Sequence, residues 1–369
     1  MNKKGSETED FCLIETPKEA RLSKFERLTL TGGEELERAL DMIGQQFASI
    51  ATQVRSIQFD LSHISRAAEF YSRSEWRKNP ATFFDPPQAP PAVTAVPVHG
   101  LKEGRIEDLS FESHFSSHAP SPHDPPENRT VHARLWRHNQ APRGTIIAVH
   151  GWSMGDQRLN SLAFFPGTFF RMGLNVALFE LPFHGRRKPA DQKDGALFPS
   201  TDLIRTNEAL AQSISDLREL RLYLQTLNSA PVGCMGMSLG AYVSALWASL
   251  DPLHFCIPIV PFVSMSEMAW GIIRKHPEFR RYQAAGLTHE TLDSIYAVHS
   301  PLGLKLQVAK DHVLIIAGIG DQVIPPRQTK LLWDHWKRPR MVWFGGGHAA
   351  QLKRREALAE ILRFVDGVV

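Results

Sequence analysis

The sequence predicts an α/β fold in which helices cover both faces of a mostly parallel β-sheet. Apolar runs without polar alternation recur from residue 145 onward, and strands buried on both faces have this pattern. Stretches with helical periodicity separate the runs, and such alternation of strand and helix is typical of an α/β sandwich. The runs read TIIAVHG, NVALFELP, PVGCMGMS, HFCIPIVPF, HVLIIAGIG and RMVWFGGGH.

Composition divides the chain into three regions. Residues 1–78 are polar with a helical pattern, and we expect them to form a helical arm. Residues 79–100 are rich in proline, which cannot continue a helix or a central strand, so we expect a linker there. Residues 101–369 hold the α/β pattern and begin with two alternating segments, SFESHF and VHARLWRH, that predict half-buried or edge strands.

Two further features organise residues 101–369. The segment NEALAQSISDLRELRLYLQTL predicts the longest helix, because its apolar side chains recur at spacings of three and four. These are Leu210, Ile214, Leu217, Leu220, Leu224 and Leu227. Roughly 50 residues separate Pro261 from the strand HVLIIAG, which is too long for a plain crossover. We therefore expect an inserted cap at about residues 264–306.

The helical arm carries a seven-residue repeat of apolar side chains, which is typical of a coiled coil. One core position holds Leu40, Phe47, Val54, Leu61 and Ala68, and the other holds Leu36, Ile43, Ile50, Ile57, Ile64 and Tyr71. The flanking positions lack the opposed charges that fix a parallel dimer. An apolar stripe of this length has to be buried. We expect a homo-oligomer formed through residues 36–71; the alternative is an arm that folds back on its own chain.

The overall composition limits the classes of partner and location. A formal net charge of +3 is small for 369 residues, so no nucleic-acid partner is expected. Three cysteines without metal-like spacing favour a reducing compartment, and the N-terminus lacks the apolar stretch of a secretory signal. The most apolar window, Phe255–Ile273, is interrupted by two prolines and a glutamate, which favours a buried strand and a helix start over a transmembrane span. The expected location is the cytoplasm.

The segment GMSLG places Ser238 between Gly236 and Gly240, after an apolar strand and before the helical stretch LGAYVSALWA. A Gly-x-Ser-x-Gly segment in this context forms a tight turn. Its glycines let the backbones pass closely, and the serine hydroxyl stands clear of the sheet. The alternative is a serine that only caps the helix. The strand before it and the helix after it favour a nucleophile.

A serine nucleophile needs a base and an orienting carboxylate. Asp321 ends the strand segment IAGIGD, and His348 follows the glycines of VWFGGGH. The chain order Ser238, Asp321, His348 predicts a catalytic triad. Asp334 and His335 are weaker rivals, because they lie within the helical stretch TKLLWDHW.

Acyl transfer also needs amide donors for the developing oxyanion. One is expected from Leu239, the residue after the nucleophile. The second is expected from Trp152, in the His150-Gly151-Trp152 loop after the strand TIIAVHG, with a shift by one residue as the alternative.

Taken together, AVHG, GMSLG, GDQVIPP and GGGH resemble the α/β-hydrolase superfamily over roughly residues 144–369. More narrowly, ELPFHGRRKPADQ with GMSLGAYVSAL resembles the α/β-hydrolase domain-containing 18 family and its bacterial relatives. Members of that family end the fourth strand with an acidic residue, a proline, a glycine and then Arg-Lys-Pro. Here these are Glu180, Pro182, Gly185 and Arg187-Lys188-Pro189. The resemblance implies an α/β-hydrolase fold that hydrolyses a carboxylic ester, with acyl lipids as a substrate class and no cofactor.

Other residues are candidates for contact with a substrate. Arg187 and Lys188 could hold an anionic group, and the alternatives are a solvated turn or a structural ion pair. Met265 and Trp270 give the cap an apolar surface suited to an acyl group. Five histidines lie between residues 114 and 138 without a cysteine, and we expect no metal there: His114, His118, His123, His132 and His138.

These observations favour a serine hydrolase that acts on a small-molecule or lipid ester through an acyl-enzyme on Ser238. An acyltransferase would use the same triad with a different second nucleophile. A hydrolase fold without catalysis, serving oligomerisation or interaction through the arm, is the alternative from another class.

Overall fold

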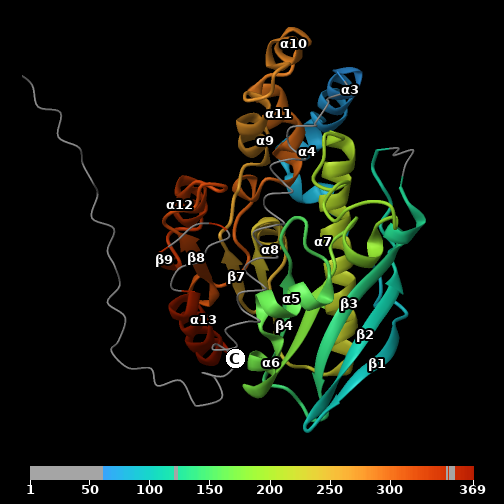
Figure 1. Ribbon diagram of the computed structural model, residues 1–369, viewed down its shortest axis with the longest axis vertical. Helices are drawn as coiled ribbons and strands as arrows, with labels where there is room; N and C mark the ends of the chain where they lie inside the picture. The colour runs from blue at the N-terminus through green and yellow to red at the C-terminus, as the bar shows by residue number, and fades with distance from the viewer. Residues whose placement is uncertain (1–60, 120–123, 346–347, 349–353) are drawn as a thin grey trace, which may run out of the picture.

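The computed structural model describes residues 61–119, 124–345, 348 and 354–369. Within these residues a nine-stranded sheet has the order β1-β2-β3-β5-β4-β6-β7-β8-β9 (Figure 1). The strands are β1 Thr94–Leu101, β2 Gly104–Glu112, β3 Thr130–His138, β4 Gly144–Val149, β5 Leu174–Phe179, β6 Val232–Met237, β7 Cys256–Ile259, β8 Leu314–Gly318 and β9 Arg340–Phe344. Neighbouring strands from β5 to β9 are parallel, whereas β1, β2, β3 and β5 pair antiparallel. The predicted mostly parallel sheet is confirmed.

The edge strand β1 begins at Thr94, inside the range 79–100 that the sequence assigned to the linker. The strand contains Pro97, and its register with β2 shifts between Pro97 and His99. Proline is tolerated at a sheet edge because the missing N–H costs no ladder bond on the open side. The linker therefore ends earlier than its composition indicated.

Helices lie on both faces of the sheet and beyond its end (Figure 1). The helices of the described residues are α3 Leu61–Tyr71, α4 Ser74–Lys78, α5 Gln157–Phe164, α6 Pro166–Arg171, α7 Leu203–Leu227, α8 Leu239–Leu250, α9 Met265–Ile273, α10 Phe279–Ala284, α11 His289–Tyr296, α12 Pro326–His335 and α13 Arg354–Val368. Along β4, Ile146 and Ala148 join the apolar cluster that contains residues of α5, α6 and α13. Their neighbours Ile147 and Val149 join the cluster that contains residues of α7 and α8. Successive side chains of a strand point to opposite faces, so an unbroken apolar run serves both layers.

The longest helix, α7, contains the predicted apolar side. Leu210, Ile214, Leu217, Leu220 and Leu224 are all buried, and Leu227 at the helix end is half-buried.

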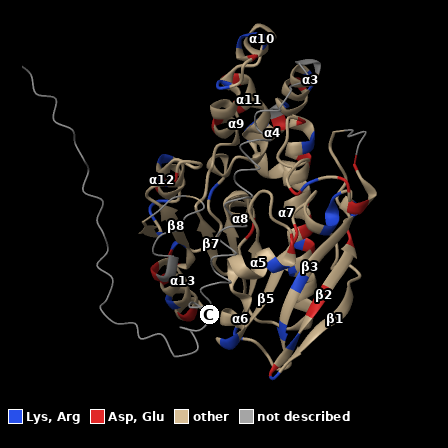
Figure 2. Cartoon of the chain, in the orientation of Figure 1, with Lys and Arg blue, Asp and Glu red and all other residues tan. Residues whose placement is uncertain are grey.

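Acidic and basic side chains are interspersed on β2 and β3 (Figure 2), where Arg134 donates from Nε to Oδ1 of Asp108 at 2.8 Å. Such mixing of charge agrees with the small net charge of the chain.

The cap predicted at about 264–306 is occupied by α9, α10 and α11, which follow the carboxyl end of β7. The apolar window 255–273 forms β7 and α9, as the prolines predicted. Within the described ranges, no helix combines the length and apolarity needed to cross a bilayer.

The described part of the arm packs on its own chain. Helix α3 lies against α11 of the cap and against α7, with Ile64, Ala67 and Tyr71 buried (Figure 1). The Tyr71 hydroxyl donates to Oε1 of Glu208 on α7 at 2.6 Å. Ile64 and Tyr71 are core positions of the predicted seven-residue repeat. The rest of that repeat, residues 36–60, lies outside the described residues.

Candidate active site

Ser238 lies on a tight turn between β6 and α8, with φ 56° and ψ −114°. A side chain at Gly240 would bring its Cβ to 1.9 Å from the Val149 carbonyl oxygen, and one at Gly236 would come 2.1 Å from the Gly240 carbonyl oxygen. Both glycines are therefore required by the close approach of neighbouring backbone. The Ser238 amide donates to the Ile259 carbonyl at 3.0 Å, which ties the turn to β7.

The three residues predicted as a triad lie in hydrogen-bonding distance of one another. Nε2 of His348 lies 2.9 Å from Oγ of Ser238, and Nδ1 of His348 lies 2.6 Å from Oδ2 of Asp321. The second carboxylate oxygen of Asp321 accepts the amides of Val323 and Ile324 at 2.9 and 2.7 Å. His348 and Asp321 are buried. With Nδ1 donating to Asp321, Nε2 is left as an acceptor for the serine proton.

The rival pair lies elsewhere. Nε2 of His335 lies 2.7 Å from the Leu304 carbonyl, and the Asp334 carboxylate accepts a bond from Arg338 at 3.0 Å. Both residues belong to α12 or its end, as their helical context predicted.

The loop after β4 runs beside the nucleophile. A Cβ built on Gly151 would lie 3.5 Å from Cβ of Ser238. The Gly151 amide donates to the sulfur of Met154 at 3.3 Å, and the Met154 amide donates to the Gly151 carbonyl at 3.2 Å. Gly151 thus uses its amide inside the loop, and the Trp152 amide stays the predicted second donor. Leu239 is the first residue of α8, so its amide has no acceptor within the helix.

His150, at the start of this loop, is fully buried in a neutral form. Its Nδ1 lies 2.8 Å from the Gly151 carbonyl, and its Nε2 accepts the Leu181 amide at 3.1 Å. Burial lowers the pKa of His150 to about 4. The neutral ring therefore bonds both the loop after β4 and the loop after β5.

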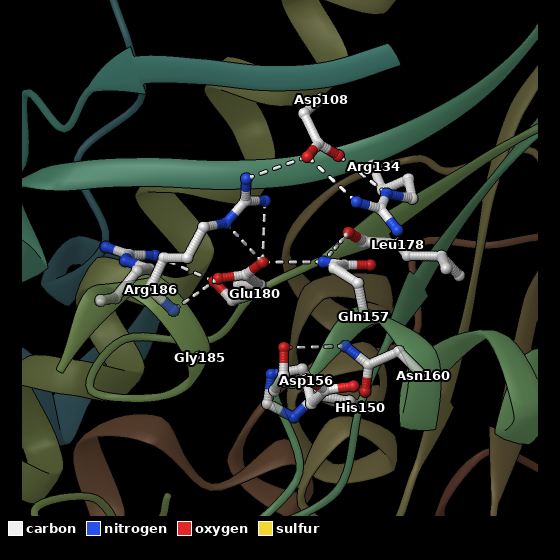
Figure 3. A network of polar contacts seen from close by, with 12 residues as sticks. Asp108, Arg134, His150, Asp156, Gln157, Asn160, Leu178, Glu180, Gly185 and Arg186 are labelled. Carbon is white, nitrogen blue, oxygen red and sulfur yellow. Dashed lines mark hydrogen bonds and ion pairs between the residues drawn. The ribbon is translucent and has the colours of Figure 1, made fainter. Parts of the chain in front are cut away.

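The loop after β5 is held by Glu180, the acidic residue of the family pattern (Figure 3). One Glu180 oxygen accepts the Arg186 amide at 2.9 Å, and the other accepts Nε2 of Gln157 at 2.8 Å. The Gly185 amide donates to Asp194 at 2.6 Å. Burial raises the pKa of Asp194, and the Gly185 amide and Lys188 oppose the rise. The sequence did not predict the roles of Gln157 and Asp194, because neither residue belongs to a motif. The nearby glycines, Gly155 and Gly195, are the sequence signal for tight loops at these positions.

Arg187 and Lys188 differ in their surroundings. Arg187 is fully buried and donates to Asp216 at 2.7 Å and to the Asn128 and Glu180 carbonyls at 2.9 and 3.1 Å. Because Arg187 has no exposed surface, the predicted contact with a substrate is corrected, and the alternative of a structural ion pair holds. Burial also raises the pKa of Asp216, while Arg187 opposes the rise. Lys188 is half-buried and near Asp194.

The two cap residues predicted to contact an acyl group lie on α9. Met265 is buried in the main apolar cluster, and Trp270 is half-buried at its border. The Trp270 ring lies 5.4 Å from the Phe279 ring and 6.1 Å from the His289 ring, centroid to centroid. Trp270 therefore also joins the helices of the cap to one another.

Four histidines of the segment 114–138 lie within the described ranges, and three of them lie in hydrogen-bonding distance of another protein group. His114 pairs with Glu219 at 3.1 Å, His118 lies 2.9 Å from the Phe83 carbonyl, and His138 lies 2.9 Å from the Phe170 carbonyl. Burial lowers the pKa of His132 to about 4. Among the described residues, no group of three His, Cys, Asp or Glu side chains could hold a metal ion.

Comparison with known proteins gives the chain a family. The family described as "Alpha/beta hydrolase domain containing 18" matches residues 68–276. An uncharacterized protein of Mycobacterium tuberculosis is 31% identical over 320 residues, which cover 83% of this chain and 74% of that protein. Acetyl xylan esterase 1 of a Thermoanaerobacterium species has a TM-score of 0.58 at 16% identity, covering 82% of this chain and 98% of its own. The acetyl xylan esterase of a Paenibacillus species has a TM-score of 0.57 at 16% identity, covering 86% and 99%. The two esterases share the fold, and the match over residues 68–276 together with the mycobacterial relative shows that the chain belongs to the α/β-hydrolase domain-containing 18 family.

Proposed function

We propose that the protein is a serine hydrolase that cleaves a carboxylic ester through an acyl-enzyme on Ser238. The observation that carries the proposal is the continuous hydrogen-bonded path from Oγ of Ser238 through His348 to Asp321, on a turn whose glycines allow neighbouring backbone to pass closely. A nucleophile, a base and an orienting group in this order suit acyl transfer. The acetyl xylan esterases that share the fold act on esters by name.

In the proposed reaction, Oγ of Ser238 attacks the acyl carbon and its proton passes to Nε2 of His348. The negative charge that develops on the carbonyl oxygen is stabilised by the amides of Leu239 and Trp152. The ester C–O bond then breaks, and His348 returns the proton to the leaving alcohol. Water attacks the acyl-enzyme, giving one proton to His348, and the carboxylic acid leaves as Ser238 regains its proton. No step uses a metal or an organic cofactor.

Asp321 is proposed to hold His348 in the tautomer that can accept the serine proton. Its Oδ1 is occupied by two backbone amides, so Oδ2 stays directed at Nδ1 of the imidazole. A carboxylate fixed in this way also stabilises the imidazolium that forms during each proton transfer.

An apolar acyl group is the finer proposal for the substrate. Trp270 of the cap supports it, because its half-buried ring adds apolar surface after the carboxyl end of β7, whereas Met265 is buried in the apolar cluster beneath. Rates on p-nitrophenyl acetate, butyrate and octanoate would separate a short-chain esterase from an enzyme for longer acyl chains. Ester formation with an added alcohol, at the expense of hydrolysis, would instead support an acyltransferase.

The test is the hydrolysis of these esters by the wild type, Ser238→Ala and Ser249→Ala. Loss of a triad nucleophile lowers turnover by up to about a million-fold, so Ser238→Ala is expected to fall to the uncatalysed background. Ser249 is the matched control, because it lies on α8 and its hydroxyl bonds only within the helix, to the Ala245 carbonyl at 2.9 Å. Near wild-type activity in Ser238→Ala would disprove the proposal, and so would no ester hydrolysis by the folded wild type.

A further inference from the structure

The side chain of Trp152 is half-buried and contacts a second loop. Its indole N–H donates to the Gly195 carbonyl at 2.7 Å. Trp152 belongs to the oxyanion loop, residues 151–155, and Gly195 belongs to what we call the platform loop, residues 181–198. A bond between residues 43 positions apart joins the two loops at this point.

The two loops also approach each other closely at two glycines. Gly195 has φ +78°, and a Cβ there would lie 2.4 Å from Nε1 of Trp152. At the other end, a Cβ on Gly155 would lie 2.5 Å from the Gly185 amide nitrogen. Real Cβ contacts do not reach these distances, so glycine is required at both positions. The two loops are therefore in tight contact at both ends of the oxyanion loop.

The platform loop is in turn fixed to the sheet. Glu180, directly after β5, is buried and accepts bonds from Arg186 and Gln157 (Figure 3). Asp194 spans the loop by accepting the Gly185 amide at 2.6 Å. A chain of contacts thus runs from β5 through Glu180, Gly185 and Asp194 to Gly195, and from Gly195 to Trp152.

The contacts of Trp152 add to the bonds that His150 and Met154 make with Gly151 at the start of the oxyanion loop. Ser153, the residue after Trp152, has φ 61°, a left-handed conformation, and the Gly151 amide donates to a thioether, a weak acceptor. An oxyanion donor is effective only when it is held at the position where charge develops. We propose that Trp152 is a positioning residue: its indole bond to Gly195 holds its own backbone amide toward the oxyanion of the Ser238 reaction. This inference rests on the proposed function.

The experiment measures kcat and KM of Trp152→Phe and Gly195→Ala on a p-nitrophenyl ester. Phenylalanine keeps an aromatic ring and removes the N–H, whereas alanine at Gly195 pushes the indole away. Removing a whole oxyanion donor lowers kcat by about 100- to 1,000-fold, so misplacing one is expected to lower kcat by about 10- to 100-fold. KM is expected to stay within about twofold, since the lost interaction exists only in the transition state. Trp333→Phe is the matched control, because Nε1 of Trp333 makes the same kind of bond to the Pro339 carbonyl at 2.8 Å, on α12.

Each result bears on the inference. Rates are divided by the number of sites that react with a fluorophosphonate, so partial misfolding of a variant does not imitate the effect. A normal kcat in Trp152→Phe, or a raised KM with normal kcat, would overturn the positioning role, and the second result would make the indole a wall of the substrate site. Ser238→Ala is assayed alongside: if it stays active the proposed function fails, whereas if it is inactive and Trp152→Phe is normal only this inference fails.

Discussion

Ser238 combines a reactive hydroxyl with a backbone conformation that side chains rarely adopt. Its φ of 56° and ψ of −114° cost on the order of 1–3 kcal/mol for a residue with a Cβ. Two backbone bonds keep the turn in place, from the Ser238 amide to Ile259 and from the Tyr242 amide to the Ser238 carbonyl, each 3.0 Å long. Strain of this size persists only where the surroundings fix the backbone. The sheet and α8 together therefore hold the hydroxyl where His348 can reach it.

Arg187 is a fully buried cation whose pairing with Asp216 can be tested by substitution. Arg187→Met is expected to lower the free energy of unfolding by about 3–5 kcal/mol, because it leaves Asp216 buried without its cation. The double variant Arg187→Met with Asp216→Leu should regain much of that loss, since no charge is then left unpaired. Urea unfolding of the wild type, the single variant and the double variant measures both effects. A single variant as stable as the wild type would show that the pair does not stabilise the fold.

At the scale of elements, the arm and the cap depend on each other. Helix α3 packs on α11 and α7. Two of its side chains bond the N-terminal part of α7: the Tyr71 hydroxyl donates to Glu208, and Nε2 of His63 lies 2.9 Å from Oδ1 of Asp202, the residue before α7. Helix α3 therefore joins α11 of the cap to α7. A substitution on the buried side of α3 should destabilise α11, whereas one on its exposed side should not.

Ile64→Asp tests this contact of α3 with α11 and α7, because it places a charge at a buried position of α3. It is expected to destabilise the protein by several kcal/mol and to increase amide hydrogen exchange in α11. Ser65→Asp is the matched control, since it adds the same charge at the exposed neighbouring position. Equal exchange in α11 for the two variants would contradict the role of the arm.

At the scale of the whole molecule, buried neutral histidines make stability depend on pH. His299 is fully buried; its Nε2 lies 2.9 Å from the Asn207 amide oxygen, and its Nδ1 lies 2.7 Å from the Tyr242 hydroxyl. Burial lowers the pKa of His299 to about 3, and that of His150 to about 4. Unfolded histidine has a pKa near 6.5, so below that pH the unfolded chain binds more protons than the folded one. Stability conferred by these two residues is therefore complete above pH 6.5 and declines as the pH falls toward 4 and 3.

The predicted loss is about 2 kcal/mol for each of the two histidines between pH 6.5 and 4.5. Urea unfolding at several pH values across this range measures it, with His299→Gln as the comparison. The variant should lose about 2 kcal/mol less than the wild type over the same interval, because the carboxylates that titrate there are common to both. Parallel pH profiles for the two proteins would contradict the assignment of a neutral His299.

Much of the site could be predicted from the sequence, and the reason is local. Ser238, Asp321 and His348 each follow an apolar strand, and the carboxyl ends of parallel strands meet at one edge of a sheet, where ligands bind in such folds. The pairing of Arg187 with Asp216 and of Trp152 with Gly195 could not be predicted, because each joins segments that only the folded chain brings together. The same holds for the arm. Its apolar stripe predicts that these side chains are buried, but the periodicity does not identify the segment or partner against which they pack. Residues 61–71 use that stripe within the chain, and self-association through residues 36–71 stays a prediction.

The proposed nucleophile Ser238 is tested most directly by the reaction of the intact protein with a fluorophosphonate, followed by peptide mass mapping. A serine activated by His348 forms a covalent phosphonyl ester, whereas an ordinary helix-capping serine does not. We predict one adduct per chain, located on Ser238 and missing from Ser238→Ala and from His348→Ala. An unlabelled wild type that is folded, or an adduct that persists in Ser238→Ala, would contradict it.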